Sequence, residues 1–166
     1  MVWVLTGRHA RAALLIGGEL VLGADGAAGE IGWITELGWK ELAKHPLSLA
    51  DAPRGEAGSE AREVIVGLRA GESSALDTVD DYARGLAPGL SALCLVLNPR
   101  LMVLGGVAPH IGAPLLWAIK KEVTEKTLRV PELRLSALGD EAVPLGAVRM
   151  GLDLAEARLF DLDGVL

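Results

Sequence analysis

Residues 23–33, GADGAAGEIGW, constrain this chain more than any other stretch of its sequence. Four glycines and three alanines lie within eleven positions, so the stretch cannot build a core from its own side chains. Glycine has no Cβ and tolerates positive φ, which lets the backbone approach another group closely. The carboxylate of Glu30 could accept two or more hydrogen bonds from a polyol in such a loop. The alternative is an ordinary strand-to-helix connection with Glu30 in water, where most glutamates lie.

This stretch resembles the G-A-x-G-x-A-G-E-x-G-H signature of the ROK family, which groups bacterial sugar kinases with sugar-responsive repressors. Two further blocks follow in the family's order, LNPRLMVLGG at 97–106 and LSALGDEAVPLGAV at 135–148. The resemblance is to the C-terminal lobe of the family and runs from residue 2 to about residue 157. It implies that Glu30, with Gly29 before it, hydrogen-bonds the hydroxyl groups of a sugar.

A metal site is not expected. The resemblance implies that the last position of the signature serves a zinc site through a histidine, but this chain has Trp33 there. Zinc takes about four nitrogen or sulfur ligands, whereas residues 33–56 contain one histidine, His45, and no cysteine. We therefore expect no metal and no other cofactor, and we expect Trp33 and Trp39 to fill space in the core.

The phosphate-binding glycines of the family are mostly missing. The resemblance places a G-T-G-x-G-x-G loop between the first two strands, where this chain reads GRHARAA and keeps only Gly7. A phosphate cradle works because successive glycines direct backbone N–H groups at the anion. Arg8, His9 and Arg11 put side chains where the phosphate would approach. Either the arginines bind phosphate themselves or, as strand alternation favours, they face solvent.

Gly105 and Gly106 follow a predicted strand and match the turn that packs against the nucleotide in the family. A double glycine at this place is also typical of a tight strand-to-helix turn. The family's first phosphate loop and catalytic aspartate belong to its N-terminal lobe, for which this sequence has no matching stretch. We therefore expect no catalytic residue here and no sugar kinase activity from this chain alone.

The hydrophobic pattern predicts three short strands followed by helices and strands in alternation. Tight turns make the first three strands an antiparallel meander. The expected strands are 2–7, 10–16, 19–23, 101–106 and 133–139, and the expected helices are 59–70, 74–97, 112–127 and 144–159. This order alone gives a mixed α/β fold, and the resemblance makes it a ribonuclease H-like lobe of the actin-like ATPase type. We expect a single domain over residues 1–160 and a frayed tail at 161–166.

Local features carry further expectations. Ser59 and Ser74 are each expected to cap the start of a helix, and Pro88 is expected to kink the longer one. The continuous apolar run 101–106 predicts a strand that is buried on both faces. Residues 33–53 carry a weak amphipathic pattern that is interrupted by glycine and proline.

Composition excludes some classes of function. The net charge of −6 argues against direct nucleic acid binding. No run reaches the ~18 apolar residues of a membrane span, and the N-terminal residues lack a signal peptide pattern. Cys94, the single cysteine, lies in an apolar stretch that is typical of a buried thiol in a reducing, cytoplasmic compartment. Since 51% of the residues are apolar, we expect a subunit interface and a homodimer.

Three functions remain open. The first is a non-catalytic lobe of a ROK-type transcriptional regulator that binds a sugar effector or supports assembly. The second is half of a split, ATP-dependent sugar kinase of the glucokinase type, with its N-terminal lobe as a separate chain. The third is a remnant that only dimerises. The lost phosphate-loop glycines disfavour the second, and the retained Glu30 with its glycine loop favours the first over the third.

Overall fold

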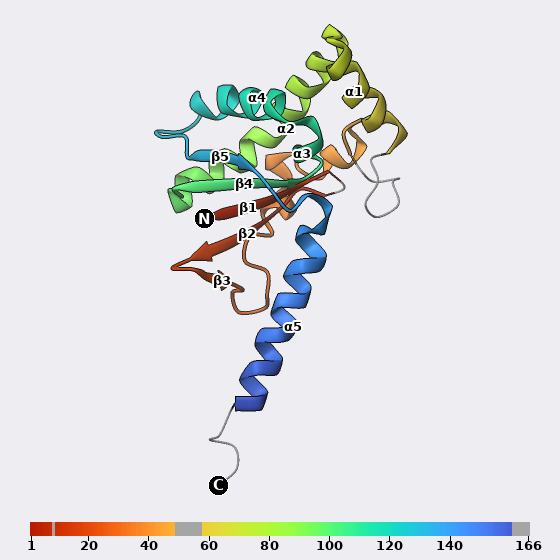
Figure 1. The fold of residues 1–166 in the computed structure, drawn as a ribbon. Coiled ribbons are helices and arrows are strands. Elements are labelled where there is room, and N and C mark those ends of the chain that lie inside the picture. The colour runs from red at the N-terminus through yellow and green to blue at the C-terminus, as the bar shows by residue number, and fades with distance from the viewer. Residues whose placement is uncertain (8, 49–57, 161–166) are drawn as a thin grey trace.

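A computed structural model describes residues 1–7, 9–48 and 58–160 and shows a five-stranded mixed sheet in the order β3-β2-β1-β4-β5 (Figure 1). β1 pairs antiparallel with β2 and parallel with β4. β2 pairs antiparallel with β3, and β4 pairs parallel with β5. The strands are β1 (Val2–Thr6), β2 (Arg11–Ile16), β3 (Glu19–Val21), β4 (Leu101–Gly106) and β5 (Glu132–Leu135). The expectation of a mixed α/β fold is confirmed, and the predicted tail at 161–166 lies outside the described residues.

Helices α1 to α4 lie over one face of the sheet, and α5 leads away on the other side (Figure 1). The segment after β3 contains 3₁₀ turns in place of the weakly predicted amphipathic element. The helices are α1 (Ser59–Ala70), α2 (Ser73–Leu97), α3 (Ala108–Ile111), α4 (Ala113–Thr124) and α5 (Ala142–Phe160), with 3₁₀ turns η1 (Ile31–Trp33), η2 (Thr35–Leu37), η3 (Glu41–Lys44) and η4 (Gly139–Glu141).

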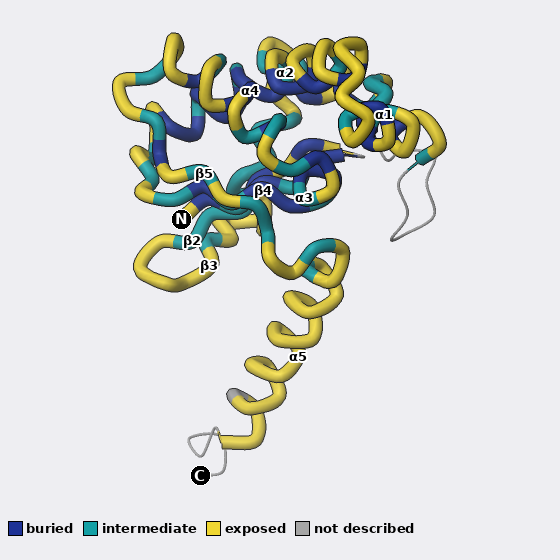
Figure 2. The backbone as a smooth tube through the Cα atoms, turned by 45° about the horizontal axis from the view of Figure 1, so that its top comes forward, coloured by how far each residue is buried: buried dark blue, intermediate teal, exposed yellow. Residues whose placement is uncertain are grey.

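The core fills the layer between the sheet and helices α1 to α4 (Figure 2). Successive side chains of a strand point to opposite faces of its sheet. In β4, Met102 and Leu104 are fully buried, whereas Leu101 and Val103 are half-buried. The prediction that this strand is buried on both faces is therefore wrong, because the helices cover one face only.

Neither predicted helix cap forms. The N-cap of α1 is Gly58 and that of α2 is Glu72, and neither makes a side-chain capping hydrogen bond. Ser59 and Ser74 lie inside the first turn of each helix, so both capping predictions are wrong. α2 continues past Pro88 without a break, from Ser73 to Leu97.

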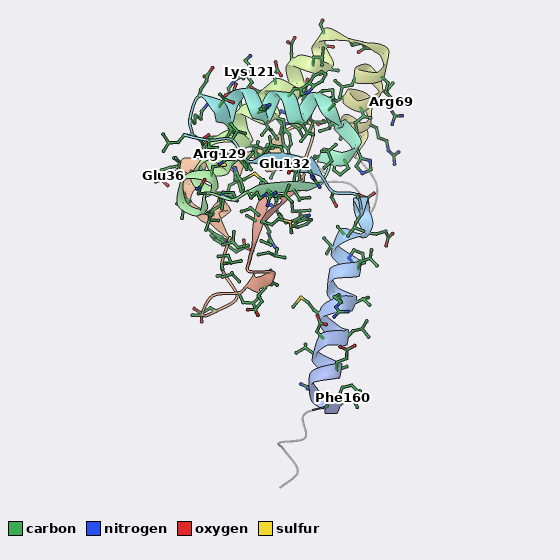
Figure 3. All side chains as sticks on the ribbon, turned by 60° about the vertical axis from the view of Figure 1, so that its left-hand side comes forward. Glu36, Arg69, Lys121, Arg129, Glu132 and Phe160 are labelled. Atoms are coloured by element: carbon green, nitrogen blue, oxygen red, sulfur yellow. The ribbon has the colours of Figure 1, made fainter. Side chains whose placement is uncertain are left out.

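Helix α5 projects from the body of the molecule (Figures 1 and 2). Figure 3 shows Phe160 at its far end, well away from Arg129 and Glu132 in the body. Its apolar residues are spread around the helix rather than gathered on one face. The large exposed ones are Val143, Leu145, Val148, Met150, Leu152, Leu154, Leu159 and Phe160. A helix that is apolar on all sides is normally buried in a larger body.

In the part of the chain that the structure describes, no helix is long and apolar enough to cross a membrane.

Candidate functional site

Three segments that are far apart in the sequence meet at one edge of the sheet. β1 and β4 are parallel and pair Thr6 with Gly106, so both strands end there. β2 is antiparallel to β1 and begins at the same edge with Arg11. The loop that contains Glu30 returns to this edge, because it contacts the first residues of β2.

Gly29 and Gly32 fix this loop against β2. Gly29 has a φ of 90°, and its carbonyl oxygen accepts a hydrogen bond of 3.3 Å from the N–H of Ala12. A Cβ on Gly29 would run into the carbonyl oxygen of Ala12, and one on Gly32 would lie 2.9 Å from that of Ala10. Since only glycine allows such an approach, the backbone on both sides of Glu30 is held close to β2.

The Glu30 side chain lies beside Arg11, with Oε2 3.9 Å from Nε. This distance is longer than a hydrogen bond, so both groups keep hydrogen-bonding capacity. The side chains are 36% and 57% exposed, respectively. They belong to a pocket of about 300 Å³, which we call the Glu30 pocket, lined by His9, Ala10, Arg11, Glu30, Gly32, Trp33, Trp39 and Lys40.

The two tryptophans of the Glu30 pocket differ in burial. Trp39 is 1% exposed, and its indole N–H donates a 3.1 Å hydrogen bond to the carbonyl oxygen of Leu86. Trp33 is 73% exposed, and Nζ of Lys40 lies 4.5 Å from the centroid of its ring, in a cation–π contact. The expected core role is therefore correct for Trp39 and wrong for Trp33.

Arg11 is exposed, as strand alternation favours, and it also lines the Glu30 pocket. Strand alternation alone does not predict this position in the pocket. The feature that could have indicated Arg11 is the antiparallel pairing of β1 with β2. This pairing brings the start of β2 back to the edge of the sheet that the glycine loop contacts. Lys40 was missed as well, and its proximity follows from a turn of 3₁₀ structure rather than from a recognisable motif. Arg8 lies outside the described residues.

Gly7 lies directly after β1, at the same edge. Its backbone N–H donates a hydrogen bond of 2.8 Å to the hydroxyl oxygen of Tyr82, which is fully buried in α2. Burial raises the pKa of Tyr82 above its usual value, although its hydrogen bonds with Gly7 and Thr6 oppose this shift. The phenol is therefore neutral, and it uses the N–H of Gly7.

Gly105 and Gly106 end β4 beside Gly7. The hydroxyl of Thr6 donates a 2.6 Å hydrogen bond to the carbonyl oxygen of Gly105 and accepts one of 3.0 Å from the N–H of Ala108. Gly106 has a φ of 71°, and a Cβ there would run into the carbonyl oxygen of Thr6. A Cβ on Gly105 would lie 2.7 Å from the indole of Trp3. Both glycines are therefore needed for packing within the lobe itself.

A second pocket, of about 490 Å³, lies between η3 and α2. Its charged groups pair with one another: Lys44 with Glu41 at 2.7 Å, and Arg84 with Asp81 at 2.8 Å. His45 also faces Asp81, with 3.6 Å between Nε2 and Oδ2. Burial lowers the pKa of His45, and the Asp81 carboxylate partly opposes this shift. Because these groups are paired, the second pocket offers a ligand less than the Glu30 pocket does.

Within the residues that the structure describes, no group of three or more His, Cys, Asp and Glu side chains could hold a metal ion. Cys94 is a free, buried thiol, and burial raises its pKa.

No protein-family model matches the sequence, and no curated protein matches it. Solved structures do match. A ROK family protein from Streptococcus pneumoniae TIGR4, in complex with sucrose, matches with a TM-score of 0.63 and 22% identity, over 85% of this chain and 54% of that one. A ROK family glucokinase from Streptomyces griseus, in complex with glucose and AMPPNP, matches with a TM-score of 0.59 and 17% identity, over 85% and 56%. A ROK family transcriptional regulator, a homolog of the E. coli MLC protein, matches with a TM-score of 0.58 and 18% identity, over 81% and 41%.

This chain thus has the fold of one part of these ROK proteins and spans about half of their length. The resemblance to the ROK family is confirmed at the level of the fold. Both a kinase and a regulator contain this fold, so the function has to be argued from the site.

Proposed function

We propose that this chain is a non-catalytic, sugar-binding lobe of the ROK type, with the ribonuclease H-like fold of actin-like ATPases, that serves as the effector or assembly lobe of a transcriptional regulator. One observation carries the proposal. Gly29 and Gly32 hold the backbone on both sides of Glu30 close to β2, and the Glu30 carboxylate lines a pocket without forming a hydrogen bond with another described residue.

The Glu30 pocket offers complementary groups to a sugar. The carboxylate of Glu30 can accept hydrogen bonds from two hydroxyl groups, and the guanidinium of Arg11 can donate to ring or hydroxyl oxygens. The exposed indole of Trp33 provides an apolar surface for the C–H groups of a pyranose ring. Two solved structures of the same fold contain sugars, sucrose in one and glucose in the other.

The state of Gly7 supports a non-catalytic role. Gly7 is the glycine that remains of the expected phosphate loop, and its N–H is already bonded to Tyr82. A phosphate cradle requires N–H groups that are free to face the anion. Gly105 and Gly106 have packing roles of their own, so weak nucleotide binding at Gly7, Gly105 and Gly106 is the less favoured use of this turn. The alternative function is half of a split sugar kinase.

Calorimetric titration of glucose and sucrose into the wild type and Glu30→Gln tests the proposal. We expect binding to the wild type and at least about a tenfold loss in Glu30→Gln, because a charged hydrogen-bond acceptor is removed. Glu41→Gln is the matched control, since Glu41 is paired with Lys44 outside this pocket. Equal affinity in Glu30→Gln would exclude the proposed site. Sugar-dependent ATP hydrolysis at about 1 s⁻¹, a low ordinary turnover, would favour the kinase.

We also propose that α5 is covered by a second copy of the same protein, in a cytoplasmic homodimer. Extensive exposed apolar surface marks an interaction site, and α5 carries eight large exposed apolar residues around its circumference. Two-fold dimers are the commonest closed assemblies. A separate N-terminal lobe is the alternative partner for the same helix.

A further inference from the structure

We infer that the Glu30 pocket takes an anionic sugar, of the sugar phosphate class, rather than a neutral one. This inference rests on the proposed sugar-binding function and adds the chemical class of the ligand. It follows from the charges that line the pocket and from what those charges contact.

Positive charge exceeds negative charge in the Glu30 pocket. Arg11 and Lys40 contribute two positive charges and Glu30 one negative charge, so the lining carries +1 even with His9 neutral. The whole chain carries −6. Because charges are screened beyond about 8 Å at physiological ionic strength, a ligand in the pocket interacts mainly with the local cations. The local excess therefore favours an anion in a chain that is acidic overall.

The hydrogen-bond donors of these cations have no acceptor among the described residues. The Arg11 guanidinium makes no hydrogen bond with another described residue, and its nearest carboxylate oxygen, on Glu30, lies 3.9 Å away. Lys40 makes a cation–π contact with the ring of Trp33, and none of its three N–H groups donates a hydrogen bond to another described residue. A phosphate monoester has three acceptor oxygens and matches the two-pronged guanidinium fork.

The second pocket provides an internal comparison. Its cations, Lys44 and Arg84, are both bonded to carboxylates, at 2.7 and 2.8 Å. Both distances are typical of charge-assisted hydrogen bonds. The cations of the second pocket thus donate hydrogen bonds to carboxylates, whereas Arg11 and Lys40 form no hydrogen bond with a carboxylate of the described residues.

The position of Glu30 divides the pocket between the two parts of such a ligand. Glu30 accepts hydroxyl groups of the sugar ring, and Trp33 supplies an apolar surface beside it. Arg11, the first residue of β2, lies next to the Glu30 side chain. A phosphate ester on the bound ring therefore falls within reach of the Arg11 guanidinium. The sugar and its phosphate are thereby recognised by different side chains, which can be tested separately.

Titration calorimetry with glucose, glucose 6-phosphate and inorganic phosphate tests the inference. We expect glucose 6-phosphate to bind the wild type at least about tenfold more tightly than glucose, the effect of one added charge-assisted contact. Arg11→Gln and Lys40→Gln should each reduce that ratio. Arg11→Lys, which keeps the charge but loses the fork, should reduce it less than Arg11→Gln. Lys44→Gln, in the second pocket, should leave the ratio unchanged, and circular dichroism should confirm that each variant is folded.

The outcomes separate the two proposals. If glucose bound as tightly as glucose 6-phosphate, the proposed preference for an anionic sugar would be wrong, but the proposed sugar binding would still hold. Inorganic phosphate binding as tightly as glucose 6-phosphate would also overturn it, because the pocket would then recognise the anion alone. Binding of neither sugar would overturn both this inference and the proposed function.

Discussion

The hydroxyl oxygen of Tyr82 accepts a hydrogen bond of 2.8 Å from the backbone N–H of Gly7 inside the core. Tyr82 comes from α2 and Gly7 from the end of β1, so this bond connects the helical layer to the edge of the sheet where the candidate site lies. It also gives a partner to the N–H of Gly7, the glycine that matches the expected phosphate loop. The same hydrogen bond therefore stabilises the lobe and disfavours phosphate binding by the N–H of Gly7.

Tyr82→Phe should lower the free energy of unfolding by about 1–3 kcal/mol, because the buried N–H of Gly7 loses its acceptor. Urea unfolding followed by circular dichroism measures the change. Asp80→Asn, an exposed position in the same helix, should change the stability by less than about 0.5 kcal/mol. If Tyr82→Phe were as stable as the wild type, the hydrogen bond would contribute nothing to the fold.

Gly29→Ala should cost more stability than Gly26→Ala, although both glycines have positive φ, 90° and 71°. Position 26 has open space around it, so alanine there meets only the backbone penalty of about 1–2 kcal/mol. At position 29 the added Cβ also runs into the carbonyl oxygen of Ala12. Unfolding in urea gives both values, and equal costs would show that the loop is not held against β2 as described.

Much of the fold could be predicted from the sequence because its signals are local. The helix expected at 59–70 is α1, and the apolar run at 101–106 is β4, since periodicity and chain-breaking residues mark both. The caps could not be predicted from residue type, because Gly58 and Glu72 are the N-cap residues and neither makes a side-chain capping hydrogen bond. The sequence did not indicate that helices cover only one face of β4, because this depends on the course of α5, which leads away from the sheet (Figure 1).

The candidate site was predictable only in part. The glycine pattern indicated Glu30 and Gly29, because close backbone approach leaves a mark in the sequence. Arg11 and Lys40 leave no such mark, and they join Glu30 only through strand pairing and a 3₁₀ turn. Trp33 was assigned to the core on its residue type, yet it is exposed, since only Trp39 contacts the α2 backbone.

Stability should fall as the pH is lowered through the titration of His45. Burial lowers the pKa of His45 in the folded state below the 6.5 of an unfolded chain. The unfolded state therefore binds more protons below about pH 6.5, and the free energy of unfolding decreases with decreasing pH, by at most about 1.4 kcal/mol per pH unit for one group. Above that pH the contribution is fully retained.

Urea unfolding at pH 7.5 and at pH 5.5 measures this effect, and His45→Asn should make the difference between the two values smaller. Asparagine keeps a side-chain acceptor for the N–H of Leu47, which bonds to Nδ1 of His45 at 3.1 Å. His110→Asn serves as the control, because His110 is exposed and pairs with Asp140 at the surface. An unchanged pH dependence in His45→Asn would assign the effect to other groups.

Helix α5 should hold the proposed homodimer together. It has 19 residues and carries large exposed apolar side chains on all sides, and among the described elements it contacts mainly η4. The double substitution Leu152→Glu with Leu154→Glu should therefore prevent association without unfolding the body of the protein. We expect sedimentation equilibrium at micromolar concentration to show a dimer for the wild type, with an interface above about 1,000 Å², and a 17.3 kDa monomer for the double variant.

A second pair of substitutions tests whether α5, rather than the helical layer, provides this interface. Val96 in α2 and Trp117 in α4 are 81% and 72% exposed, so the helical layer also presents apolar side chains to a partner. Val96→Glu with Trp117→Glu should leave the dimer intact if α5 is the interface. Dissociation by this pair, but not by the α5 pair, would move the interface to the helical layer. A monomeric wild type would argue against self-association altogether and would leave α5 to be covered by a different chain, such as a separate N-terminal lobe.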